Sequence, residues 1–104
     1  MSHFRLSHLP VVAGLVTLLV LAACQSAPVQ EMSDARQAIS VAQKAGAAEH
    51  APGDLKAAMD YLHSAESFIS QRNYDLARRD AVNAKASAMS ALDASSAKKQ
   101  VTAD

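Results

Sequence analysis

The sequence predicts an all-α protein of three antiparallel helices, a short first helix and then a longer helical hairpin, with alanine in the seams between them. From residue 24 onward the chain holds 20 alanines among 81 residues. The aromatic side chains there are Tyr61, Phe68 and Tyr74. Alanine has the highest helix propensity, whereas strands favour aromatic and β-branched residues. Apolar residues also recur at helical spacing along this part of the chain.

Residues 1–23 are expected to form a signal peptide that is cleaved. Residues 1–8 carry one fixed positive charge, Arg5, and residues 9–23 carry none. A cationic start, an apolar run of about 7–15 residues and small residues at its end are typical of an export signal. A membrane-spanning helix needs about 18 or more apolar residues. We therefore expect removal of this segment rather than a permanent membrane helix.

Residues 21–24, Leu-Ala-Ala-Cys, resemble the lipobox of bacterial lipoproteins. The resemblance implies cleavage between Ala23 and Cys24, a diacylglyceryl group on the Cys24 thiol and acylation of the new amino group. Sulfur is the nucleophile that such a thioether requires. Each buried methylene contributes about 0.8 kcal/mol, so three acyl chains would hold the protein on a bilayer. The alternative is an ordinary secretory signal with an unrelated cysteine near its cut site.

The residues after Cys24 bear on sorting and on the tether. Gram-negative lipoproteins with Asp after the cysteine tend to stay in the inner membrane, whereas Gln25 and Ser26 follow here. For a Gram-negative source we expect the periplasmic leaflet of the outer membrane. Residues 24–32 would form the lipidated cysteine and a tether, with Pro28 blocking an early helix. Eight extended residues reach about 26–29 Å.

The helical domain is expected over residues 33–99, followed by a frayed tail over residues 100–104. Ser33 or Asp34 would cap the first helix, and Gly46 would end it. Met32 is placed to act as a hydrophobic staple. One face of this helix is marked by Ala35, Ala38, Ile39, Ala42 and Ala45.

A connector over residues 46–53 should lead into the hairpin. Pro52 suits the first position of the second helix, and Asn73 caps the third, which runs over residues 74–98 after a turn at 70–73. The second helix has an apolar stripe of Leu55, Met59, Leu62, Ala65 and Ile69. The third has a seam of Ala77, Ala81, Ala84, Ala88 and Ala91, widened by Val82, Met89 and Leu92. Such seams bury little area, so we expect marginal stability, self-association or a protein partner.

The hairpin resembles one tetratricopeptide-type helix pair over residues 61–84. The matching positions are Tyr61, Ala65, Phe68, Asn73, Tyr74, Asp75, Ala77 and Ala84. Such repeats generally need three or more copies to be stable alone, and one copy is present. The resemblance therefore implies a repeat-like hairpin rather than an array.

Residues 32–96 resemble a family of short bacterial lipoproteins labelled only as a domain of unknown function. The resemblance is carried by residues 34–36 with 38–39, residues 51–52 with Leu55, and Tyr74 with residues 77–78 and Ala81. That family occurs alone or ahead of an OmpA-like peptidoglycan-binding domain. It implies a helical fold and an envelope location. No OmpA-like segment follows here, so no peptidoglycan site is carried over.

The charge balance and motifs predict neither a nucleic-acid binder nor an enzyme. Residues 24–104 contain nine Lys and Arg and ten Asp and Glu, so they lack the basic excess that nucleic-acid binders carry. The sequence has no G-x-S-x-G motif and no phosphate-binding glycine loop. His63 lies between Asp60 and Glu66 at helical spacing, which a solvated face explains better than a zinc site. We expect no catalytic residue, cofactor or metal.

The arginines of the hairpin are expected to make ordinary surface pairs. Asp75 lies three and four residues before Arg78 and Arg79, a spacing worth about 0.2–0.5 kcal/mol per pair. Contact of Arg72, Arg78 and Arg79 with lipid phosphates or glycan strands is the less favoured alternative to solvation.

The leading hypothesis is a non-enzymatic, lipid-anchored helical module that acts as an interaction scaffold in the cell envelope. Its expected partners are the membrane, through acylated Cys24, and a protein or a second copy. The alternative is an alanine-rich oligomer that links the outer membrane to peptidoglycan, as the major murein lipoprotein does. That protein ends in the lysine it uses for attachment, whereas this chain sets Lys98 and Lys99 back from its end. A lipid or small-molecule carrier is the third hypothesis.

Overall fold

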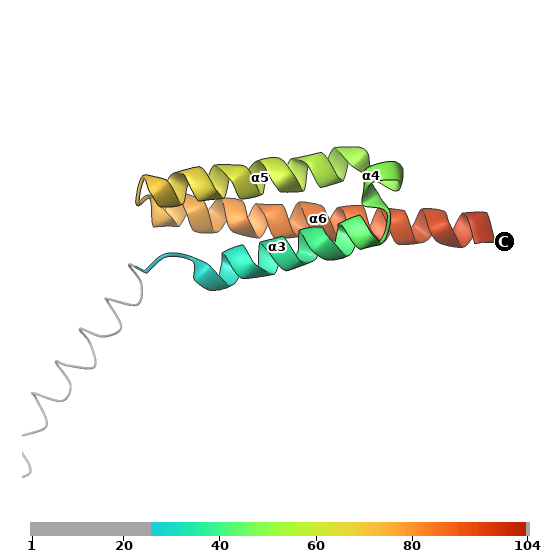
Figure 1. Ribbon diagram of the computed structural model, residues 1–104, viewed down its shortest axis with the longest axis horizontal. Helices are drawn as coiled ribbons and strands as arrows, with labels where there is room; N and C mark the ends of the chain where they lie inside the picture. The colour runs from blue at the N-terminus through green and yellow to red at the C-terminus, as the bar shows by residue number, and fades with distance from the viewer. Residues whose placement is uncertain (1–25, 104) are drawn as a thin grey trace, which may run out of the picture.

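The computed structural model describes residues 26–103, with side chains to residue 101, and this part of the chain is helical with no strand (Figure 1). The predicted all-α class is confirmed. The helices are α3 (Val29–Lys44), α4 (Ala47–His50), α5 (Pro52–Ser70) and α6 (Tyr74–Ala103).

The three long helices lie side by side, and each of α3 and α5 packs against α6 more extensively than against the other. Successive long helices run antiparallel (Figure 1). The start of α3 and the turn from α5 to α6 therefore lie at one end of the bundle, which we call the turn end. The short α4 and the C-terminus lie towards the opposite end, where α6 extends past its neighbours.

Alanine fills the seams as predicted, because its small side chain lets helix axes approach closely. All five seam alanines predicted for the third helix are fully buried in α6. The larger core cluster consists of Ile39, Ala42, Ala47, Ala51, Leu55, Ala58, Ala88 and Ala91. A smaller cluster near the turn end joins Met32, Ala65 and Ala81 from three different helices.

Three larger side chains that we expected in the seams lie outside them instead. Met59, Val82 and Met89 are 48%, 52% and 50% exposed. Ala58 is buried beside Met59. Helices that meet through alanine leave little room for longer side chains between their axes, so these residues stay at the edge of the contact.

The first helix begins earlier than predicted. Residues 29–32, expected as tether, form the first turn of α3, and Pro28 occupies its N-cap position. Proline is tolerated there because the first turn has no intrahelical partner for its missing N–H. Asp34 lies inside the helix, where Gln30 Nε2 donates to its Oδ1 at 2.9 Å. Met32 is 3% exposed and packs across to α5 and α6 rather than stapling its own helix.

The connector and the C-terminal tail are more helical than predicted. The connector contains α4, and α6 continues to Ala103, so residues 100–103 are helical. Gly46 ends α3 as predicted, with φ at +89°, and its N–H donates to the carbonyl of Gln43 at 3.0 Å. Pro52 begins α5 as predicted.

The turn from α5 to α6 closes with two backbone hydrogen bonds. The Arg72 N–H donates to Ile69 O at 2.9 Å, and the Asn73 N–H donates to Phe68 O at 2.8 Å. This pairing is the Schellman motif, whose central residue is left-handed and usually glycine. Arg72 holds that position with φ at +58°.

Candidate functional site

Arg78 binds the start of the described chain to the first turns of α6. Its Nη2 donates to the carbonyl of Ser26 at 3.2 Å, and its Nε donates to Glu31 Oε1 at 3.3 Å. Its Nη1 lies 3.7 Å from Asp75 Oδ1, so the predicted pair between these two residues is confirmed. The fixed fork of the guanidinium suits such divergent contacts. One side chain thus holds the segment before α3 in place.

The segment over residues 26–28, expected as part of the tether, packs onto the bundle. The Pro28 side chain is fully buried. The Val29 N–H donates to Ala27 O at 2.8 Å, and the Met32 N–H donates to Pro28 O at 3.0 Å. The predicted attachment and cleavage residues, Cys24 and Ala23, lie outside the described residues.

A buried carboxylate, which the sequence pattern did not indicate, lies between α5 and α6. Asp80 is 4% exposed. Ser64 Oγ donates to its Oδ2 at 2.6 Å, and Arg79 Nε and Nη2 donate to its Oδ1 at 3.2 and 3.1 Å. Arg79 therefore pairs with Asp80, and the prediction that it pairs with Asp75 is wrong. The signal that could have indicated the buried carboxylate is its register, because Asp80 lies three residues after Ala77 and four before Ala84, on the same face of α6 as both buried alanines.

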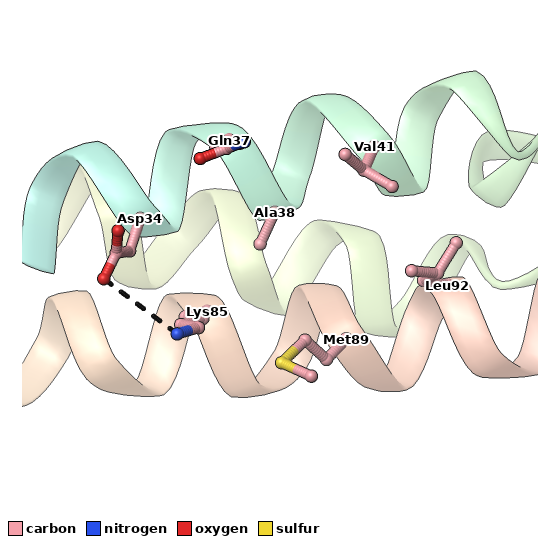
Figure 2. Close-up of a pocket in the computed structure, with 7 residues that line it drawn as sticks. All are labelled: Asp34, Gln37, Ala38, Val41, Lys85, Met89 and Leu92. Atoms are coloured by element: carbon pink, nitrogen blue, oxygen red, sulfur yellow. Dashed lines mark ion pairs between the residues drawn. The ribbon is translucent and has the colours of Figure 1, made fainter.

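A groove runs between α3 and α6 on the outer side of the bundle (Figure 2). Its lining residues are Asp34, Gln37, Ala38, Val41, Lys85, Met89 and Leu92. At one end, Asp34 Oδ2 and Lys85 Nζ lie 4.0 Å apart. The rest is mainly apolar, with Val41 and Met89 both exposed to solvent. Such a surface can receive apolar side chains from another helix.

The carboxylates on either side of His63 have partners of their own. Asp60 Oδ2 lies 2.6 Å from Lys56 Nζ, and Glu66 Oε1 lies 3.6 Å from Arg36 Nη2. Among residues 26–103 no cluster of three metal-type side chains is present. Within the same range, none of the helices combines the length and the apolar character needed to cross a bilayer.

The match to a protein family covers the whole helical domain. No match was found among curated proteins or among solved structures. A family model described as "Domain of unknown function (DUF4398)" matches residues 30–103. This range begins at the second residue of α3 and ends at the last residue of α6, so the unit shared by the family is the bundle itself. The chain belongs to the DUF4398 family.

Proposed function

We propose that this protein is a lipid-anchored adaptor on the periplasmic leaflet of the outer membrane, and that it acts without catalysis. The observation that carries the proposal is the Leu-Ala-Ala-Cys sequence at residues 21–24, which directly precedes the helical domain. Three acyl chains at Cys24 would supply lasting membrane attachment. The helical domain would then supply the binding surface.

The groove between α3 and α6 supports the adaptor role. It joins an apolar strip, which includes Met89, to a charged end formed by Asp34 and Lys85. An amphipathic helix binds such a groove through apolar residues on one face, with polar groups at the rim fixing its register. We propose that the occupant is an amphipathic helix of a partner protein.

The anchor is tested with Cys24→Ser, because oxygen cannot take the place of sulfur in the thioether. Cells that express the protein are labelled with palmitate, and the membrane fraction is collected. We expect label and the processed form for the parent protein, and an unlabelled, uncut precursor for Cys24→Ser. Ser26→Ala is the control and should be labelled normally. Equal processing and membrane retention of Cys24→Ser would contradict the anchor.

The adaptor role is tested by photo-crosslinking in cells. A photoreactive residue at Met89 lies in the groove, and one at the exposed Ser67 on α5 is its control. The proposal predicts a defined protein adduct from position 89 that is absent from position 67. The same adducts from both positions, or none from position 89, would contradict it. A form released with muropeptides by lysozyme would favour the peptidoglycan-linking alternative.

A further inference from the structure

The chain between the proposed lipid on Cys24 and the bundle is short, and it joins the bundle at the turn end. Cys24 precedes Ser26 by two residues, and two residues span at most about 7 Å when extended. Ser26 is itself held by Arg78 near the start of α6, and Pro28 is buried. Acyl chains on Cys24 would therefore keep the turn end close to the leaflet, rather than leave the domain on a tether of about 26–29 Å.

The opposite end of the bundle lies far from this entry point. Helix α6 starts at the turn end and has 30 residues, which corresponds to a length of about 45 Å. Its C-terminal end lies at the far side of the molecule (Figure 1). The excluded orientation is therefore the one in which the far end of α6 lies at the membrane and the turn end points away from it, because the anchor at the turn end could not reach the bilayer.

Arg72 marks the turn end with an exposed cation in a strained position. Its φ of +58° falls in the left-handed region, where the motif favours glycine or asparagine. Strain of this kind in a non-glycine residue is a reason to look for a function. Among residues 26–101, whose side chains the structure describes, its guanidinium has no hydrogen-bond or ion-pair partner, whereas Arg78 binds Glu31 and Arg79 binds Asp80. Arg72 is therefore the arginine of this turn that is left to bind a ligand.

We propose that the turn end is a membrane-facing surface on which Arg72 binds a phospholipid phosphate. The proposal rests on lipidation at Cys24. A guanidinium pairs with phosphate through two parallel hydrogen bonds, and arginine beside an anionic leaflet is attracted to it. The acylated Cys24 would hold the turn end near the leaflet, and Arg72 in the turn would contact the phosphate.

The orientation is tested by quenching of a fluorophore with brominated lipids. The full lipidated protein is placed in bilayers of phosphatidylethanolamine and phosphatidylglycerol, and its acylation is first established by mass spectrometry. Cys24 is the chain's sole cysteine, so once acylated it leaves any introduced cysteine as the single free thiol. We attach the fluorophore to Gln71→Cys in the turn or to Ser96→Cys near the far end of α6, both at exposed positions. Quenching at position 71 and its absence at position 96 are expected.

The role of Arg72 is tested by combining Gln71→Cys with Arg72→Gly. The glycine removes the cation and relieves the backbone, so quenching should fall while the melting temperature rises. Arg72→Lys keeps the charge and should retain more of the quenching than glycine. Arg36→Ala, which removes a cation on α3, is the matched control and should leave quenching unchanged.

The outcomes separate this proposal from the proposed function. A mass that lacks acyl chains on Cys24 contradicts the lipid anchor, and the present proposal with it. An acylated protein with equal quenching at positions 71 and 96 contradicts the orientation alone. Unchanged quenching in Arg72→Gly contradicts the phosphate contact.

Discussion

Arg78 and Ser26 are 52 positions apart in the sequence, yet Nη2 of the arginine lies 3.2 Å from the carbonyl oxygen of the serine. The same guanidinium reaches Glu31 in the first turn of α3. These contacts join the beginning of the domain to the beginning of its last helix. The bundle thereby includes residues just after Cys24 that would otherwise be a free linker.

Arg78→Ala should destabilise the domain, because it releases the Ser26 carbonyl and leaves Glu31 without its cation. Hydrogen bonds to charged groups are worth about 1.5–3 kcal/mol when protected from water. The Arg78 side chain is about one-third exposed, so we expect a loss nearer about 1 kcal/mol in urea denaturation. Arg36→Ala breaks a more exposed pair with Glu66 and should change the free energy of unfolding by less than about 0.5 kcal/mol. Equal effects would contradict a special role for Arg78.

Arg72→Gly should stabilise the protein. A left-handed conformation costs an ordinary residue about 1–2 kcal/mol, and glycine avoids most of this while adding entropy to the unfolded chain. A net gain of about 0.5–1 kcal/mol is expected, visible as a higher melting temperature. Arg72→Ala keeps the strain and serves as the control. A lower melting temperature for the glycine variant would mean that the Arg72 side chain itself stabilises the fold.

The glycines at positions 46 and 53 should respond in opposite directions to alanine. At Gly46 φ is +89° and a new Cβ would lie 3.2 Å from His50 Cδ2, so Gly46→Ala should destabilise the fold by about 1–2 kcal/mol. At Gly53, inside α5, the Cβ would meet nothing within 4 Å. Gly53→Ala should therefore stabilise by up to about 1 kcal/mol. Thermal unfolding of the two variants side by side checks this, and the same sign for both would refute it.

Ser64→Ala should destabilise the protein, because the buried Asp80 carboxylate loses a hydrogen-bond donor. It removes the hydroxyl that donates to Asp80 Oδ2 and leaves that oxygen without this partner between two helices. A buried acceptor without its partner costs about 1–3 kcal/mol. Ser67→Ala, on the exposed side of α5, should cost less than about 0.5 kcal/mol. Chemical denaturation that fails to separate the two serines would show that water replaces the Ser64 hydroxyl.

The neighbours Ala81 and Val82 test which face of α6 is packed. Ala81 is fully buried and Val82 is about half exposed. Ala81→Leu should destabilise by about 1–3 kcal/mol, because it forces extra methylenes into a close helix contact. Val82→Leu should change stability by less than about 0.5 kcal/mol. Comparable losses of stability from both variants would indicate that Val82 lies in the core, as the sequence pattern predicts.

The helical class and the α6 seam could be predicted because both are local properties of the sequence. Alanines from Ala77 to Ala91 recur at spacings of three and four, and few competing strand formers interrupt them. The rotation of α5 could not be predicted in the same way. Met59 and Ala58 are both apolar, and the close approach of alanine-lined helices decides that the smaller one is buried.

The site at the turn end depends on contacts that no local pattern contains. Pro28 predicts a break in a helix, but whether it lies in a tether or against a core depends on Arg78 and Met32, which lie elsewhere in the fold. Apolar periodicity also does not predict that Asp80 is buried, because a charged residue is not expected in a seam until its partners are known. Long-range polar contacts of this kind become visible only in the folded molecule.

The lipid anchor at Cys24 is tested most directly by the mass of the N-terminal tryptic peptide of the protein extracted from membranes. Trypsin would release residues 24–36 if processing occurs between Ala23 and Cys24. We predict a peptide that begins at Cys24 and carries a diacylglyceryl group on sulfur and a third acyl chain on nitrogen. An unmodified Cys24, or a mature protein that still contains residues 1–23, would contradict the lipid anchor.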